Sequence, residues 1–86
     1  MSEKYLSPTD YLLTNVNGQV LTITLNRPDA LNSIRPEMLD GIRKLIVNTE
    51  NDENISVIVI EGSGRAFSAG VDLKVLQGID PKAGKI

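Results

Sequence analysis

Residues 62–74, which read GSGRAFSAGVDLK, have the composition of a loop that could hold a ligand. They follow a β-branched run, and ligands of open α/β sheets bind beyond the carboxyl ends of the strands. The small side chains of Ser68, Ala69 and Gly70 let a ligand approach the backbone closely. Backbone N–H groups in the first turn of a following helix would then face negative charge. On composition alone, a tight connection without a ligand is the alternative interpretation.

Two phosphate-binding patterns do not fit this loop. The dinucleotide-binding fingerprint would place its third glycine at position 67, where this chain has Phe67. A P-loop requires Gly-Lys-Ser or Gly-Lys-Thr, and neither sequence occurs in the chain. Composition also argues against a nucleic-acid-binding domain, because 9 basic and 11 acidic residues give a net charge of −2.

A second segment, residues 25–33, reads LNRPDALNS and by itself fits a strand exit followed by a helix cap. Together with residues 66–73, AFSAGVDL, it resembles the crotonase superfamily, the enoyl-CoA hydratase/isomerase group. The resemblance covers residues 11 to about 77. It implies an α/β chain that forms the N-terminal part of a crotonase-like, ββα-type spiral fold of the ClpP/crotonase class. Residues 1–10 are expected to be a loose lead-in, and 11–86 the N-terminal portion of an incomplete acyl-CoA-binding domain.

The resemblance also implies roles for individual residues. In this family two backbone N–H groups hold the thioester carbonyl, and the first belongs to the residue after Ala-Gly, here Val71. The second donor and the general acid and base come from segments beyond residue 86. Some members carry lysine where this chain has Asp29, so phosphate binding is expected to be weaker or differently arranged. Contacts with the acyl-CoA are implied for Ala30, Leu31, Ser33, Ala69, Gly70, Val71, Asp72, Leu73 and Lys74.

An oxyanion hole of this kind would stabilise an enolate. Attack at Cβ of an enoyl thioester, or removal of a Cα proton, moves charge onto the carbonyl oxygen, which fixed N–H donors hold. The resemblance therefore implies an acyl-CoA-handling enzyme, and we expect the complete protein to hydrate a 2-enoyl-CoA. Isomerase, hydrolase, decarboxylase and dehalogenase activities are the alternatives. Coenzyme A enters as the thioester substrate, with no covalently bound cofactor and no metal.

These 86 residues alone are expected to be catalytically inactive. Hydration requires one group to activate water and another to protonate Cα, and no two carboxylates of this chain have positions suited to those roles. A second hypothesis is a truncated, non-catalytic module that binds acyl-CoA or docks onto other subunits. A non-functional fragment is the third. For the complete protein, the family implies a homotrimer or hexamer.

Several residue types are absent from the chain. It has no Cys and no His, which excludes disulfides, thiol nucleophiles, zinc–thiolate sites and imidazole chemistry within it. No apolar run approaches the roughly 20 residues of a membrane span. The polar start of the chain lacks the apolar core of a signal peptide. We therefore expect a cytoplasmic protein with no membrane or nucleic-acid partner.

The order of elements that must position the motifs is hairpin, helix, strand. Strands are predicted over 11–16 and 19–26, joined by an Asn17-Gly18 turn with positive φ at both residues. The second strand should be half buried, with Leu21, Ile23 and Leu25 on one face. The run at 56–60 fits a parallel strand that is buried on both faces.

A helix is expected to begin within residues 33–36, and a second one near Asp72. Asn32 or Ser33 would cap the first helix, and Pro36 would lie in its first turn, where a missing N–H does no harm. Its apolar face is predicted from the helical spacing of Met38, Leu39, Ile42, Leu45 and Ile46.

Overall fold

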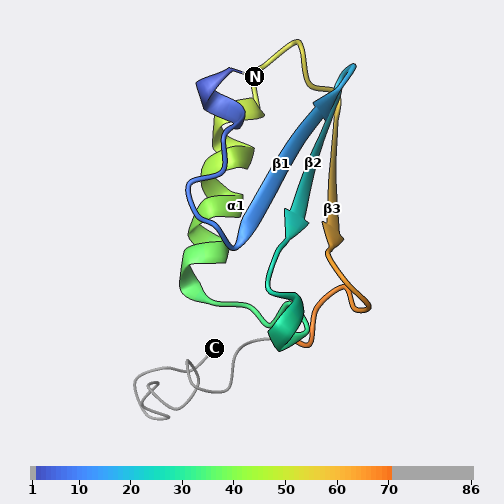
Figure 1. Ribbon diagram of the computed structural model, residues 1–86. Helices are drawn as coiled ribbons and strands as arrows, with labels where there is room; N and C mark the ends of the chain where they lie inside the picture. Colours follow the sequence, from blue (N-terminus) through green and yellow to red (C-terminus); the bar gives the residue numbers. More distant parts are fainter. Residues whose placement is uncertain (1, 71–86) are drawn as a thin grey trace.

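A three-stranded sheet and one α-helix form two layers in the computed structural model, which describes residues 2–70 (Figure 1). β1 pairs antiparallel with β2, and β2 pairs parallel with β3, in the order β1-β2-β3. The predicted order of hairpin, helix and parallel strand is therefore confirmed. The elements are η1 (Glu3–Tyr5), β1 (Leu12–Asn17), β2 (Val20–Leu25), η2 (Pro28–Ala30), α1 (Pro36–Thr49) and β3 (Val57–Gly62).

The turn of the hairpin lies one residue later than the sequence predicts. Asn17 pairs with Val20, so the two turn residues are Gly18 and Gln19. Gly18 has φ +60, whereas Asn17 is not among the residues of the described chain with positive φ. A glycine at the first central position is typical of a type II′ turn, so the expectation of positive φ at both Asn17 and Gly18 is wrong.

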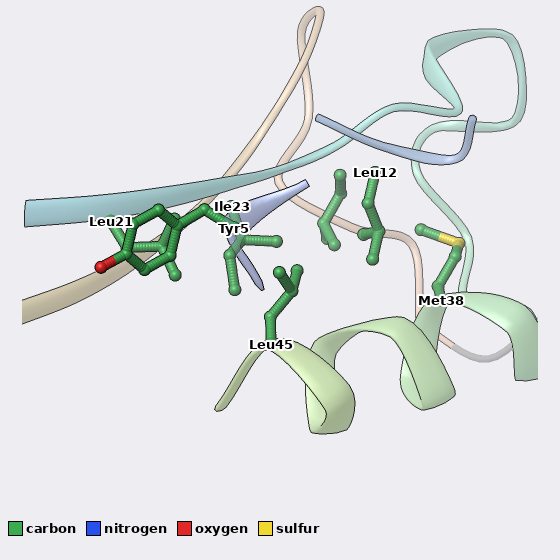
Figure 2. Close-up of a cluster of buried hydrophobic side chains, with 7 residues drawn as sticks. Tyr5, Leu12, Leu21, Ile23, Met38 and Leu45 are labelled. Atoms are coloured by element: carbon green, nitrogen blue, oxygen red, sulfur yellow. The ribbon is translucent and has the colours of Figure 1, made fainter. Parts of the chain in front are cut away.

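The alternation predicted for β2 is confirmed, and it builds the core. Leu21, Ile23 and Leu25 are buried, with at most 1% of their surface exposed, while the residues between them are half buried. Figure 2 shows side chains from the sheet, from α1 and from η1 meeting in one cluster. Complete burial of a side chain of this size contributes about 1.5–3 kcal/mol. The cluster consists of Tyr5, Leu12, Leu21, Ile23, Leu25, Met38 and Leu45.

Helix α1 begins at Pro36, as predicted, but neither expected residue caps it. Its N-cap is Arg35, which makes no side-chain capping bond, while Asn32 is fully buried and bonds elsewhere. The predicted apolar face is correct for Met38 and Leu45, which are buried. It is wrong for Leu39 and Ile46, which are 57% and 40% exposed, because the buried positions of α1 are Met38, Gly41, Leu45 and Thr49.

Strand β3 is parallel, as predicted, but it is not buried on both faces. Val57, Val59 and Ile60 are 50%, 39% and 39% exposed. In Figure 1, β3 lies at the edge of the sheet away from α1. Among residues 2–70, strand β2 is its neighbour on one side and no strand lies on the other. The β-branched run therefore gives the correct pairing but not the expected burial.

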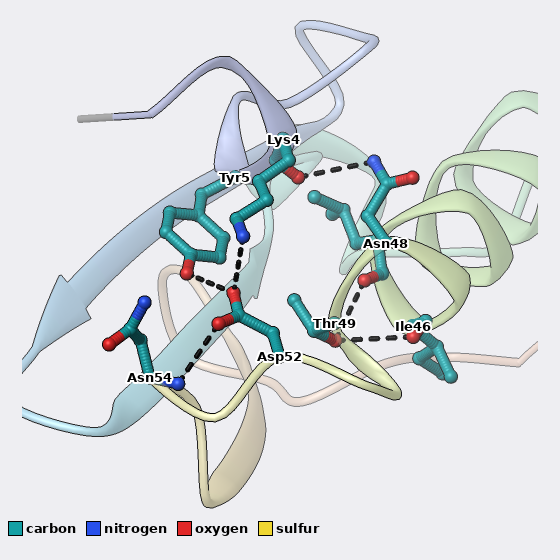
Figure 3. A network of polar contacts seen from close by, with 8 residues as sticks. Lys4, Tyr5, Ile46, Asn48, Thr49, Asp52 and Asn54 are labelled. Carbon is teal, nitrogen blue, oxygen red and sulfur yellow. Dashed lines mark hydrogen bonds and ion pairs between the residues drawn. The ribbon is translucent and has the colours of Figure 1, made fainter.

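Residues 2–10 do not form the loose lead-in expected from their polarity. Tyr5 enters the core with 7% of its surface exposed, and its hydroxyl donates to the Asp52 carboxylate. Lys4 Nζ lies 3.0 Å from the same carboxylate, and the backbone N–H of Asn54 donates to it (Figure 3). These contacts bind the start of the chain to the connection between α1 and β3. No helix in the part of the chain described is long and apolar enough to cross a membrane.

Candidate functional site

The two sequence motifs meet at one end of the sheet. The segment after β2 contains residues 26–35, and the segment after β3 contains residues 63–70. Because β2 and β3 run parallel, with Leu25 opposite Gly62, both segments leave the sheet at the carboxyl ends of these strands (Figure 1). Open α/β sheets bind ligands beyond this end.

Asn32 joins the two segments through its side-chain amide. Its Nδ2 donates to the carbonyl oxygens of Ser63 at 2.7 Å and Ala66 at 2.8 Å. Its Oδ1 accepts from the backbone N–H of Arg27 at 2.8 Å. The residue is 0% exposed, so these bonds form where water cannot replace them. This buried amide therefore joins the first motif to the second.

Backbone hydrogen bonds extend this junction up to Gly70. The N–H of Ala69 donates to the carbonyl of Leu31 at 2.9 Å, and the N–H of Ile34 donates to the carbonyl of Gly70 at 2.7 Å. The Ser68 hydroxyl donates to the carbonyl of Asn32 at 2.8 Å. Leu31 and Ala69, predicted from different motifs, are thus brought into direct contact.

Leu31 and Asn32 both adopt left-handed backbone conformations, with φ of 52° and 55°. Asparagine tolerates this region, whereas a branched apolar side chain does so at a cost of roughly 1–2 kcal/mol. The cost at Leu31 is offset by bonds from its N–H to Pro28 and from Ala69 to its carbonyl. Strained non-glycine residues held in this way cluster at functional sites.

Arg27 supports the first motif from the side of β1. Its guanidinium donates to the carbonyl and hydroxyl oxygens of Ser33 at 2.8 and 3.0 Å and lies 5.3 Å from the ring centre of Tyr11. An open cavity of about 250 Å³ lies beside this pair and includes Asp29 and Ala30 in its lining. A cavity of about 360 Å³ elsewhere, between Pro8 and α1, has no contact with either motif.

Gly62 allows the second segment to fold back over the end of β3. A Cβ atom at this position would lie 2.4 Å from the carbonyl oxygen of Phe67 and 2.5 Å from that of Ala66. Both are backbone atoms, so no side-chain rotation could remove the overlap. Glycine is therefore required by the path of the loop that carries the second motif.

Five predicted site residues lie at the junction, and the other four lie outside the described residues. Ala30, Leu31 and Ser33 are half buried, whereas Ala69 and Gly70 are exposed. The sequence interpretation missed the roles of Asn32, Arg27 and Gly62, and treated Ser68 only as a small residue. The residues that the structure does not describe are Val71, Asp72, Leu73 and Lys74.

Comparison of the sequence with known proteins identifies the family of this chain. Residues 20–84 match the sequence model described as enoyl-CoA hydratase/isomerase. This chain belongs to the enoyl-CoA hydratase/isomerase family. It is 38% identical over 72 residues to the 1,2-epoxyphenylacetyl-CoA isomerase of Escherichia coli, a match that covers 84% of this chain and 27% of that protein. It is also 35% identical over 82 residues to the small ribosomal subunit protein mS47 of Schizosaccharomyces pombe, covering 86% of this chain and 19% of that protein.

Solved structures of the family confirm the fold. An enoyl-CoA hydratase/isomerase from Mycobacterium paratuberculosis superposes with a TM-score of 0.74 at 40% identity, covering 90% of this chain and 28% of that one. The crotonase-like α/β fold expected from the two motifs is therefore correct. The chain spans about a quarter of the length of the first curated relatives it matches.

Proposed function

We propose that this chain binds a coenzyme A thioester at the junction of the two motifs. Ala30, Leu31 and Ser33 would contact the coenzyme A from one segment, and Ala69 and Gly70 from the other. Val71, Asp72, Leu73 and Lys74 would complete the site. The observation that carries the proposal is the hydrogen bond from the N–H of Ala69 to the carbonyl of Leu31 at 2.9 Å, which joins the two halves.

The backbone donor to the thioester carbonyl would be the N–H of Val71. The two preceding N–H groups already have partners, because Ala69 donates to Leu31 and Gly70 donates to the Ser68 hydroxyl at 3.0 Å. Neither is therefore left for a ligand, which supports the assignment to position 71. A backbone donor requires no particular side chain, so valine is acceptable there.

The chemistry would be stabilisation of an enolate. A preorganised N–H donor aimed at the carbonyl oxygen holds the charge that develops there, and loss of one such donor typically costs about 10²–10³ in rate. The complete protein would use this site to hydrate a 2-enoyl-CoA, with its second donor and its acid and base supplied beyond residue 86. The same proposal includes a cytoplasmic homotrimer or hexamer. Isomerisation of an acyl-CoA passes through the same enolate, whereas hydrolysis would place a tetrahedral oxyanion at the same donor; these two reactions are the alternatives.

A non-catalytic module that docks onto other subunits is the second candidate. The exposed apolar side chains of Val57, Val59 and Ile60 favour it, because among residues 2–70 strand β3 has a neighbouring strand on one side only. In addition, one relative of this chain is named as a ribosomal subunit protein and not as an enzyme. This candidate predicts binding to a longer family member instead of turnover.

Calorimetric titration of the 86-residue chain with crotonyl-CoA tests the first candidate. We expect binding without loss of the enoyl absorbance, because the acid and base are not in these residues. Ala69→Glu would place a carboxylate at the exposed end of the site and abolish binding. Asn51→Glu adds the same charge at an exposed position of the α1–β3 connection and should bind as the wild type does. No binding by the wild type, or equal binding by Ala69→Glu, would contradict the proposal, and turnover by the purified chain would contradict its expected inactivity.

A further inference from the structure

The hairpin between β1 and β2 presents an Asn-Gly pair to solvent. Asn17 is the last residue of β1, Gly18 is the first residue of the turn, and both are exposed. The carboxamides of Asn26, Asn32 and Asn48 each donate to a backbone carbonyl. Among residues 2–70, the carboxamide of Asn17 has no such partner, so it can turn back toward its own main chain.

The backbone nitrogen of Gly18 is accessible to that side chain. Strand pairing ends at Asn17 and Val20, so the Gly18 N–H lies outside the ladder. A Cβ atom built on Gly18 would have no atom beyond its chain neighbours within 4 Å, so nothing crowds the nitrogen. Glycine also changes its backbone angles with little steric hindrance. The nitrogen can therefore reach Cγ of Asn17, and the ring that closes has five members.

We propose that Asn17 is a site of spontaneous modification, which converts it to aspartate and isoaspartate through a succinimide. The Gly18 nitrogen attacks Cγ of Asn17 and loses its proton, and the side-chain nitrogen leaves as ammonia. Water then opens the ring. Addition at Cγ breaks the new bond and gives aspartate, whereas addition at the α-carbonyl breaks the original peptide bond and gives isoaspartate. Both products carry one negative charge more than asparagine.

Isoaspartate alters the joint between the hairpin and β3. Its main chain runs through Cβ and Cγ, so the turn gains one carbon atom. A two-residue turn has a defined geometry, and the pair Asn17–Val20 that closes it cannot keep its register. Gln19 of the same turn holds the start of β3, because its carbonyl and its Oε1 accept from the N–H and the hydroxyl of Ser56, each at 2.7 Å (Figure 1). The conversion therefore loosens the end of the sheet at which β3 begins.

Incubation of the 86-residue chain in warm, mildly alkaline buffer, followed by proteolysis and mass spectrometry, measures the conversion at each asparagine. Replacement of the amide –NH₂ by –OH changes the mass, and enzymatic methylation distinguishes isoaspartate from aspartate. Asn15 and Asn51 are internal controls, because both are exposed but precede Val16 and Asp52 instead of glycine. Asn17→Gln is the matched variant, since its ring would have six members and close far more slowly.

We expect Asn17 to convert several-fold faster than Asn15 or Asn51, with isoaspartate among the products. The Asn17→Gln chain should keep its mass at this position over the same period. Conversion of Asn17 no faster than that of the two internal controls would overturn the proposal. Aspartate without isoaspartate would also overturn it, because direct hydrolysis of the side chain gives aspartate only.

Hydrogen exchange on the separated products tests the structural consequence. The isoaspartate chain should lose protection at the N–H of Ser56, which bonds to Gln19. The Asn17→Asp chain has the same added charge on an unaltered main chain and should keep that protection. Exchange within α1 is the reference in both chains and should not differ. Equal protection of Ser56 in the two chains would show that the turn accommodates the extra atom, and the loosening of β3 would then be wrong.

Discussion

The side-chain amide of Asn32 donates to the backbone carbonyl of Ala66, 34 residues further along the chain, at 2.8 Å. The same nitrogen donates to Ser63, and Oδ1 accepts from the N–H of Arg27. An asparagine side chain has two donor hydrogens and one acceptor oxygen, and all of them are used here without exposure to water. One buried amide therefore makes three of the hydrogen bonds that hold the proposed acyl-CoA site together.

Asn32→Asp should destabilise the chain in a way that depends on pH. The carboxylate retains the shape and the acceptor but donates to neither carbonyl, and each buried group left unpaired costs about 1–3 kcal/mol. Burial beside two carbonyl oxygens raises the pKa of this carboxyl group, and its protonated form regains one donor. The deficit relative to the wild type should therefore be smallest at low pH and increase as the pH rises through that raised pKa. Urea denaturation at several pH values measures it.

The control for this variant is Asn51→Asp, which makes the same change at an exposed position. It should alter the free energy of unfolding by less than about 0.5 kcal/mol. A deficit in Asn32→Asp that is no larger than this, or that does not vary with pH, would contradict the role assigned to the Asn32 amide.

Leu31→Asn should separate stability from ligand binding. Asparagine accepts the left-handed conformation that leucine adopts at a cost of roughly 1–2 kcal/mol, so stability should be unchanged or rise by up to about 1 kcal/mol. Acyl-CoA affinity should fall, because the apolar surface proposed to contact the coenzyme A is removed. Leu39→Asn is the control, since it makes the same change at an exposed site in α1. It should lower stability slightly through helix propensity and leave affinity unchanged. A loss of stability in Leu31→Asn as large as that in Leu39→Asn would contradict the strain at Leu31.

The elements of this fold are predictable from the sequence because their signals are local. Alternation at Leu21, Ile23 and Leu25 requires only the period of a strand, and Pro36 is suited to the first turn of a helix wherever that helix packs. The burial of β3 could not be predicted in the same way. Whether Val57 or Val59 is covered depends on neighbouring segments, and among residues 2–70 such a neighbour exists on one side only.

The site is predictable where small residues mark it and unpredictable where distant partners define it. Composition and family resemblance identify Ala69 and Gly70. The sequence predicts Asn32 or Ser33 as the helix cap, because these side chains usually bond to nearby N–H groups when they precede a helix. Its amide instead bonds to Ser63 and Ala66, and no local pattern indicates partners so far along the chain.

Gly62→Ala should disrupt the second motif specifically. The added Cβ would meet two backbone carbonyl oxygens at 2.4 and 2.5 Å, so residues 63–67 must move away from β3 and from the Asn32 amide. We expect a loss of about 1–3 kcal/mol, the usual range for overpacking, together with loss of acyl-CoA binding. Gly18→Ala is the control: its φ of +60° is unfavourable for alanine, but a Cβ there has no atom within 4 Å. It should lower stability and retain binding. Wild-type stability in Gly62→Ala would show that the loop does not follow this path.

Acid should weaken the attachment of the N-terminal residues through Asp52. Hydrogen bonds from Tyr5, the backbone of Asn54 and Lys4 lower the pKa of this carboxyl group from 3.8 to about 2 (Figure 3). A lowered pKa in the folded state means that the contribution to stability is present above pH 3.8 and is lost as the pH falls toward 2. Asp52→Asn should therefore be less stable than the wild type at pH 7, and this difference in stability should narrow below pH 4.

Tyr5→Phe, which removes the largest cause of the lowered pKa of Asp52, should reduce the acid sensitivity in part. Asp40→Asn, at an exposed position on α1, should unfold in parallel with the wild type at every pH. Urea midpoints between pH 2 and 7 measure all four chains, and a constant difference between Asp52→Asn and the wild type would show that the Asp52 carboxylate does not hold the start of the chain.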